Sequence, residues 1–262
     1  MRRVAGQFFT KRCGLLTGLA LAFGRPLPAA ELELKEILDR MVQMDQTRAG
    51  ILGGYTCIRT YSLQNARFRK KAQMVVRVTC RLTGEKEFEI LSESGSQTIR
   101  RRVFRRLLEA EWEASQHHNR EEVRIDPNNY DFRRVGEESL GGRKAYVLEV
   151  TPKRASRFSI IGKIWLDAED FAIARIEASP AKSPSIWVRQ TMITHAYGKF
   201  GPFWLPVLNR SKAEALIFGP TEFQILYQSY EIRARAGSAI PAATPEPQEL
   251  KTGQIPRFGF VP

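Results

Sequence analysis

The chain has few of the residues that most often bind metals or carry out catalysis. Its 262 residues include only three histidines and three cysteines. His117 and His118 are neighbours, whose side chains would diverge by about 100° on a helix, and His195 stands alone in an expected strand. Neither arrangement has the spacing of metal ligands. The sequence therefore predicts no metal site and no cofactor.

Motifs for covalent or phosphate chemistry are also missing. The chain has no glycine-rich phosphate loop and no G-x-S-x-G elbow. Asp167, Glu169 and Asp170 could act as paired carboxylates in acid–base catalysis, but an aspartate-rich hairpin loop accounts for them better. The sequence favours a binding protein without catalytic residues over an enzyme. A hydrolase with residues scattered along the chain is a remaining alternative.

An apolar run too short to cross a bilayer lies near the N-terminus. Residues 13–23 are mostly apolar, basic residues precede them, and small residues follow as far as Ala30. This order is typical of a secretory signal peptide, whereas a membrane-spanning helix needs about 20 apolar residues. We expect residues 1–30 to be a signal peptide cleaved near Ala30, and the mature protein to be periplasmic. A buried N-terminal helix is the alternative.

The chain is basic, with a formal net charge of +13 that falls to +8 when the five basic residues of 1–30 are left out. Such a charge often indicates nucleic-acid binding, but an exported protein meets little nucleic acid. Acidic lipid headgroups or an anionic glycolipid are therefore the expected partners of this charge. A solvated surface that keeps the protein soluble accounts for it equally well.

Two cysteines, Cys57 and Cys80, lie outside the predicted signal peptide. They fall in two expected strands whose connecting segment is centred near Phe68. A hairpin centred there places the two cysteines directly opposite each other, which is close enough for a bond. Because exported proteins commonly carry disulfides, we predict a Cys57–Cys80 disulfide.

Hydrophobic periodicity predicts two helices, over residues 31–49 and 101–116. In the second helix, Phe104, Leu108 and Trp112 repeat at four-residue spacing. Its first turns contain five arginines that work against the helix macrodipole, which favours a mobile lid or a lipid-facing helix. An ordinary surface helix that buries one side is the alternative. These arginines are Arg100, Arg101, Arg102, Arg105 and Arg106.

Alternation with a period of two predicts about nine strands. Their expected ranges are 55–64, 72–83, 86–93, 144–152, 161–167, 171–179, 185–197, 203–217 and 221–234. Long antiparallel strands that outnumber the helices predict a mainly β fold with added helices, an α+β protein. We expect a curved antiparallel sheet or unclosed β-barrel over residues 31–235, with helices over its concave face. Residues 236–262, rich in Pro and Ala, are expected to form a flexible tail.

An exported chain with this order of elements resembles the LolA/LolB group of bacterial lipoprotein carriers, whose relatives include the regulator RseB. Three segments carry the resemblance: 146–153 (YVLEVTPK), 162–177 (GKIWLDAEDFAIARIE) and 199–206 (KFGPFWLP). The resemblance spans roughly residues 34–234. It implies a LolA-like, unclosed β-barrel with a helical lid over an apolar cavity that takes acyl chains or other hydrophobic partners.

The resemblance implies a periplasmic carrier that binds the acyl chains of a lipoprotein or a lipid and takes part in outer-membrane lipoprotein sorting. The second helix would be its lid. The alternative is an RseB-like interaction module that senses the state of the envelope by binding a membrane protein or an anionic glycolipid at the membrane surface. The residues expected to contact a hydrophobic ligand are Val76, Val78, Phe88, Ile90, Phe104, Leu108, Trp112, Tyr146, Leu148 and Trp165.

Overall fold

The computed structural model describes residues 32–116, 121, 124–156, 158–182, 188–215, 219–235 and 237. The predicted signal peptide, residues 1–30, lies outside this part of the chain, as do His117, His118 and all of the predicted tail except Gly237. Within the described residues, no helix is both long and apolar enough to cross a membrane.

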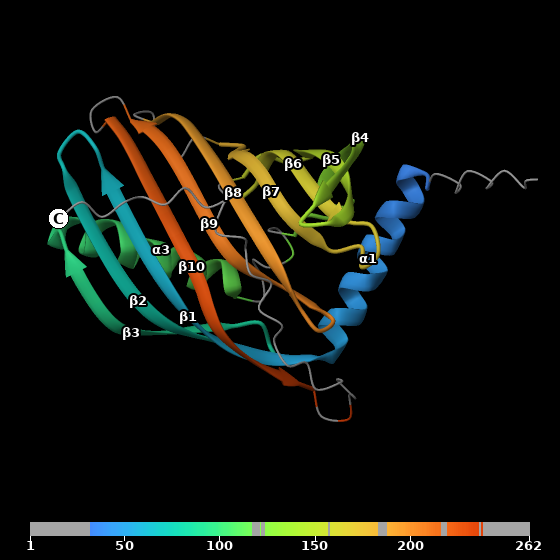
Figure 1. Ribbon diagram of the computed structural model, residues 1–262, viewed down its shortest axis with the longest axis horizontal. Coiled ribbons are helices and arrows are strands. Elements are labelled where there is room, and N and C mark those ends of the chain that lie inside the picture. The colour runs from blue at the N-terminus through green and yellow to red at the C-terminus, as the bar shows by residue number, and fades with distance from the viewer. Residues whose placement is uncertain are drawn as a thin grey trace, which may run out of the picture. The chain divides into compact units, whose positions relative to one another are not determined.

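Ten strands form one antiparallel sheet, with the spatial order β3-β2-β1-β10-β9-β8-β7-β6-β5-β4 (Figure 1). The strands are β1 (Leu52–Asn65), β2 (Lys70–Cys80), β3 (Lys86–Gly95), β4 (Tyr130–Leu140), β5 (Arg143–Pro152), β6 (Ile160–Asp167), β7 (Ile173–Pro180), β8 (Val188–Phe200), β9 (Phe203–Ala215) and β10 (Gly219–Ala234). Every pair is sequential except β1 with β10, which joins the first three strands to the last seven. The sheet is curved and does not close, because β3 and β4 remain its two edges. This confirms the predicted fold class.

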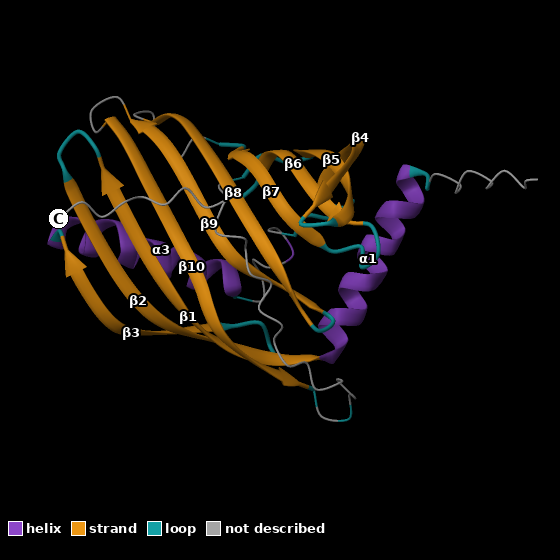
Figure 2. Cartoon of the chain, viewed as in Figure 1, coloured by secondary structure: helices purple, strands orange, loops and turns teal. Residues whose placement is uncertain are grey.

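Helices lie before and within the run of strands (Figure 2). Helix α1 (Leu34–Ile51) precedes β1. A second helical segment follows β3 and consists of α2 (Gln97–Ile99), a π-helical turn (Arg100–Phe104) and α3 (Arg105–Ser115). Both helical regions agree with the two predicted from the 3.6-residue periodicity.

The face of the sheet covered by these helices, called the inner face below, follows from the alternation of β1. Tyr55, Cys57, Arg59, Tyr61 and Leu63 are all buried, and the residues between them are more exposed. Successive side chains of a strand point to opposite faces, so these five share one face. Their partners across the ladder share it too, including Val76 opposite Arg59 on β2 and Tyr227 opposite Arg59 on β10.

Strand β4 was missed by the sequence patterns. Its burial alternates only weakly: Tyr130 is buried, whereas most other side chains are partly or fully exposed. The ladder to β5 also shifts between Arg134 and Gly136, which breaks the period of two. An edge strand with a largely polar surface lacks the apolar alternation by which a strand is recognised.

The predicted disulfide is wrong. Asn65 pairs with Lys70 across the β1–β2 turn, and this register places Cys57 opposite Val78 and Cys80 opposite Tyr55. Every partner is thus moved by two residues from the predicted one. The two cysteines are buried and diagonal to each other, and they do not form a disulfide with one another.

Candidate functional site

The second helical segment packs two apolar side chains onto the inner face, Phe104 from the π-helical turn and Leu108 from α3. Phe104 is fully buried and Leu108 is nearly so, and both belong to the apolar cluster formed with β1, β2 and β10. The Phe104 ring lies 6.2 Å from the ring of Tyr61 and 6.3 Å from that of Phe223. These distances are typical of favourable aromatic pairs. The helix therefore covers the inner face at the β1–β3 end of the sheet.

An ion triad built around a buried arginine joins the same helix to the sheet. Arg59 Nη1 on β1 donates to both carboxylate oxygens of Glu111 on α3, at 2.8 Å, and Lys86 Nζ on β3 donates to Glu111 Oε1 at 2.6 Å. The Arg59 side chain is only 1% exposed. A charge this deeply buried is tolerated because it is paired. The triad therefore holds α3 across the first three strands.

The pairing also fixes the charge state of Glu111. Burial alone would raise the pKa of this carboxyl, but Lys86 and Arg59 outweigh burial and lower its pKa to about 2. Glu111 is consequently ionised at any pH near neutrality, and the triad carries one net positive charge. This charge lies next to side chains of the apolar cluster, including Val76 opposite Arg59.

Tyrosine rings surround the Arg59 guanidinium. Its Cζ lies 4.8 Å from the ring centroid of Tyr227, a cation–π distance, and Nη1 is 3.4 Å from the hydroxyl of Tyr61. Burial raises the pKa of Tyr61 to about 12 although Arg59 acts to lower it. Burial likewise raises the pKa of Tyr197 to about 12. These hydroxyls stay protonated near neutral pH and are polar, hydrogen-bonding groups on the inner face.

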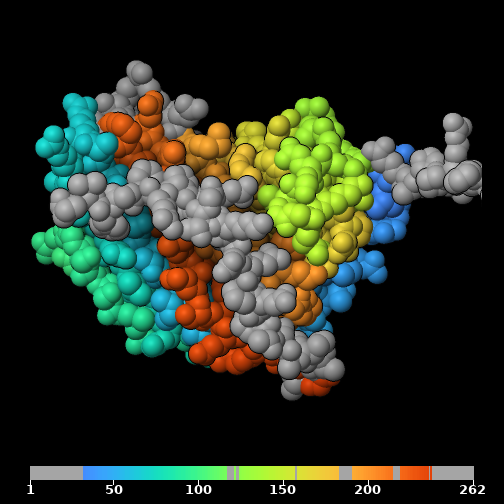
Figure 3. Space-filling view, in the orientation of Figure 1, coloured from blue at the N-terminus to red at the C-terminus, as the bar shows by residue number. Residues whose placement is uncertain are grey.

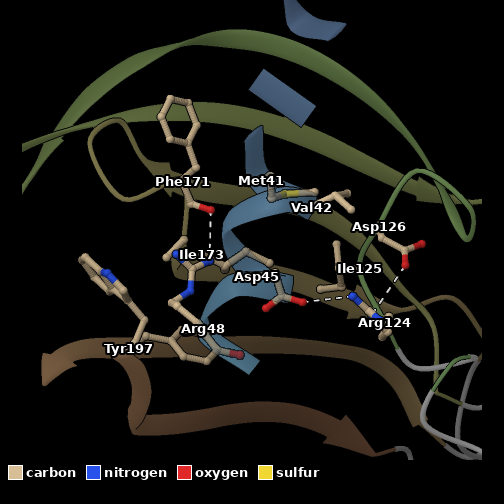
Figure 4. A pocket seen from close by; sticks show the side chains of 12 residues that line it. Met41, Val42, Asp45, Arg48, Arg124, Ile125, Asp126, Phe171, Ile173 and Tyr197 are labelled. Atoms are coloured by element: carbon tan, nitrogen blue, oxygen red, sulfur yellow. Dashed lines mark hydrogen bonds and ion pairs between the residues drawn. The ribbon is translucent and has the colours of Figure 1, made fainter. Parts of the chain in front are cut away.

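A pocket of about 260 Å³ lies beside α1, at a different part of the inner face (Figure 4). It is lined by Met41, Val42, Asp45 and Arg48 of α1, by Arg124, Ile125 and Asp126, by Phe171, Ala172 and Ile173 before and in β7, and by Tyr197 and Trp204. Arg124 Nη2 donates to Asp45 Oδ2 at 3.0 Å, and Arg48 Nη1 donates to the backbone oxygen of Asp170 at 2.7 Å. The pocket is thus partly apolar, with ion pairs at its margin.

The loop carboxylates of the β6–β7 hairpin have structural partners. Asp167 Oδ1 accepts from the backbone N–H of Asp170 at 2.8 Å, and Arg143 donates to both oxygens of Asp167. Asp170 Oδ2 accepts from Trp204 Nε1 at 2.9 Å and pairs with Lys199 at 2.6 Å. Burial acts to raise the pKa of Asp167, but the Arg143 hydrogen bonds lower it. These contacts tie the hairpin to β5, β8 and β9.

His195 lies on β8 opposite Ile176 and Asn209. Burial lowers its pKa, and the Glu111 carboxylate only partly offsets this, which favours the neutral form of the imidazole. Among the described residues, no group of three or more His, Cys, Asp and Glu side chains is placed to hold a metal ion.

Eight of the ten residues predicted to contact a ligand lie on the inner face or point toward it. Val76, Val78, Phe88 and Ile90 belong to the apolar cluster with Phe104 and Leu108. Tyr146 and Leu148 lie on the same face of β5, near α1, where Tyr146 stacks 6.3 Å from Phe171. The predicted set is therefore divided between the two ends of the sheet.

Two of the ten lie elsewhere. Trp112 is 52% exposed on the outer side of α3. Trp165 packs with Ala145 and Val147 on the opposite face of the sheet, and its Nε1 donates to Glu138. The strand period places Trp165 on that face, because it is one residue out of phase with Ile164, the inner-face partner of Leu148. None of the ten lines the pocket beside α1.

Sequence reasoning missed the ion triad, although one part of it had a readable signal. Arg59 falls in phase with Tyr55, Cys57 and Tyr61, so a charged residue occupies the apolar side of a strand. Buried charges of this kind are rare unless paired. The partner, Glu111, comes 52 residues later and could not be read from spacing.

The chain is similar to several solved structures of LolA-like proteins. No family model matches it, and no curated protein does. A DUF1329 family protein from Desulfovibrio piger is 13% identical, with a TM-score of 0.40, and a domain described as an outer-membrane lipoprotein-sorting protein from Vibrio parahaemolyticus is 12% identical, with a TM-score of 0.40. A LolA superfamily protein from Nitrosomonas europaea is 12% identical, with a TM-score of 0.34.

Each of these three matches covers 78% of this chain and 94% of the other. Two of these proteins are described as belonging to the LolA superfamily or as lipoprotein-sorting, the group that the sequence resembles, and this similarity is distant. At such low identities and TM-scores it carries no ligand and no partner over to this chain.

Proposed function

We propose that the protein is a periplasmic carrier that buries the acyl chains of a lipoprotein or lipid against the inner face and takes part in outer-membrane lipoprotein sorting. The observation that supports this most is the contact of α3 with the sheet. Phe104 and Leu108 occupy an apolar surface formed by β1, β2, β3 and β10. In the carrier, cargo replaces these two side chains when α3 lifts.

The free energies of burial permit this exchange. Exposing Phe104 and Leu108 costs about 1.5–3 kcal/mol each, whereas burying ten methylenes of an acyl chain contributes about 8 kcal/mol. The pocket beside α1 holds only about 260 Å³, which is below the usual range for a small-molecule site. It has room for the end of one chain, and a complete chain needs the surface under α3 as well.

The ion triad gives the carrier a defined closed state. Glu111 holds α3 to β1 and β3 through Arg59 and Lys86. When α3 moves away, the paired charges separate and Arg59 is exposed to solvent or to the polar headgroup of the cargo. Opening therefore has a cost that only cargo with enough apolar surface offsets, and this disfavours opening of the empty protein.

A second function, an RseB-like interaction module that senses envelope state, is supported by the outer side of α3. Leu107 is 36% exposed and Trp112 is 52% exposed there. Aromatic side chains are enriched where proteins bind one another. In this alternative α3 stays closed, and its outer side binds a membrane protein or an anionic glycolipid.

A matched pair of charge substitutions on α3 tests the carrier. Leu108→Glu places a carboxylate within the apolar surface, whereas Trp112→Glu places one on the exposed side of the same helix. We expect lipid to co-purify with the wild type and with Trp112→Glu in native mass spectrometry, and to be lost from Leu108→Glu. Circular dichroism would establish that both variants fold.

The carrier is wrong if folded Leu108→Glu retains the lipid, or if the wild type carries none and takes up none from vesicles. Loss of a bound membrane protein in Trp112→Glu alone would favour the interaction module.

A further inference from the structure

Two basic segments meet at one end of the sheet. The β1–β2 turn contributes Arg67 and Arg69, and the start of β2 contributes Lys70 and Lys71. The start of the second helical segment contributes Arg100, Arg101, Arg102, Arg105 and Arg106. The backbone N–H of Ser96 donates to the backbone oxygen of Lys71 at 2.8 Å, so the two segments lie next to each other. These nine residues are called the basic end below.

Little negative charge offsets the basic end. Residues 64–71 and 95–106 contain no Asp or Glu. Glu93 lies 3.5 Å from Arg100 and 3.4 Å from Arg105. Among the described residues no carboxylate pairs with the other seven cations, all of which are exposed.

The position of the arginines works against the stability of the helix. Positive charges near a helix N-terminus are repelled by its macrodipole, and arginines three or four residues apart repel one another. Three of them, Arg100, Arg101 and Arg105, line an open depression of about 460 Å³ together with Glu93 and Gln97. A concave, cationic surface of this kind fits the phosphate of a headgroup, because guanidinium groups bind phosphate oxygens in pairs.

An exposed aromatic side chain is placed among these charges. Phe68 is at the tip of the β1–β2 turn and is 49% exposed. The Arg67 guanidinium lies 5.9 Å from its ring centroid. The tip forms a projecting corner of the molecule, at the upper left in Figure 3. An exposed apolar ring contributes little to binding a dissolved polyanion, whereas at a bilayer interface it can be buried between the headgroups.

We propose that the basic end docks the protein on the phosphate headgroups of an anionic bilayer, with Phe68 inserted at the interface. This goes beyond the carrier function, because docking depends on the basic end and not on the inner face. Each cation near an anionic bilayer adds several-fold to the binding constant. Docking should accordingly weaken as salt screens the charges.

Co-sedimentation with vesicles tests the proposal. We expect the purified wild-type chain to bind phosphatidylglycerol-containing vesicles at low salt and to release them at high salt. It should not co-sediment with vesicles made of phosphatidylcholine alone. A variant with Arg67, Arg69, Arg101 and Arg102 all changed to Gln should bind at least ten times more weakly. A control with four exposed cations outside the basic end changed to Gln should bind as the wild type does; these are Arg154, Lys163, Arg233 and Arg235.

A single substitution separates a bilayer from an acidic polypeptide. Phe68→Ala keeps every charge, so it should weaken vesicle binding several-fold and leave binding to polyglutamate unchanged. The proposal is overturned if the quadruple variant binds vesicles like the wild type, if the control loses binding equally, or if the wild type binds polyglutamate but no anionic vesicles. Binding of cargo at the inner face is measured by native mass spectrometry, a separate experiment. Failure of the carrier function therefore does not change the outcome of the vesicle assay.

Discussion

Arg59 on β1 and Glu111 on α3 form an ion pair in which one guanidinium nitrogen lies 2.8 Å from both carboxylate oxygens. The pair connects the proposed lid to the surface beneath it. Because Arg59 is 1% exposed, its charge depends on this partner and on the Tyr227 ring. The pair therefore decides both how firmly α3 is held and what it costs to lift.

Removing Glu111 should destabilise the protein strongly. Glu111→Ala leaves Arg59 buried without a carboxylate, and we expect a loss of about 3–5 kcal/mol in the free energy of unfolding. The double substitution Arg59→Met with Glu111→Leu replaces both charges with apolar groups and should recover most of that stability. Urea denaturation of the two variants and the wild type gives the comparison. If Glu111→Ala is as stable as the wild type, the buried Arg59 charge does not depend on the Glu111 carboxylate.

The same carboxyl should give a characteristic acid dependence. Its pKa is lowered from 4.5 to about 2 on folding, so its contribution is complete above pH 4.5 and is lost as the pH falls toward 2. Glu111→Gln has no such group and should show a smaller loss of stability over that interval. Thermal denaturation at several pH values measures the difference. Parallel curves for the two proteins would show that Glu111 is not paired.

Filling the pocket beside α1 should reduce cargo binding if the end of an acyl chain enters it. Val42→Trp adds a large ring to the lining, whereas Gln43→Trp adds the same ring on the exposed side of α1. We expect the first to lower acyl-chain affinity at least several-fold and the second to leave it unchanged. Displacement of a fluorescent fatty acid gives the affinities. Equal affinities would place the cargo entirely under α3.

Two glycine substitutions should shift stability in opposite directions. A methyl group at Gly162 on β6 would overlap the backbone oxygen of Glu177 and come within 2.5 Å of Ala178 Cα on β7, whereas nothing lies within 4 Å of such a group at Gly50 in α1. Gly162→Ala should cost about 1–3 kcal/mol through overpacking, and Gly50→Ala should add about 0.5–1 kcal/mol. Calorimetry measures both. A neutral Gly162→Ala would mean that β6 and β7 can separate there.

Local patterns alone predicted most of the elements. Both helical regions and nine of the ten strands follow from hydrophobic periodicity, because core-facing side chains must repeat every 3.6 or every two residues. The exception, β4, is a largely polar edge strand whose apolar alternation stops after Tyr130 and Phe132. The arginines at 100–106 were also evident from the sequence, because their conflict with the helix macrodipole is local.

What the chain's sequence determined by itself was thus the kind of fold and the list of apolar side chains that could face a ligand. Tertiary structure decided the rest: the two-residue change of register that separates Cys57 from Cys80, the face on which Trp165 lies, and the meeting of Arg59 with Glu111. Register and pairing depend on how distant strands and helices pack, since a shift of one residue exchanges the faces of a strand. No local pattern contains that information.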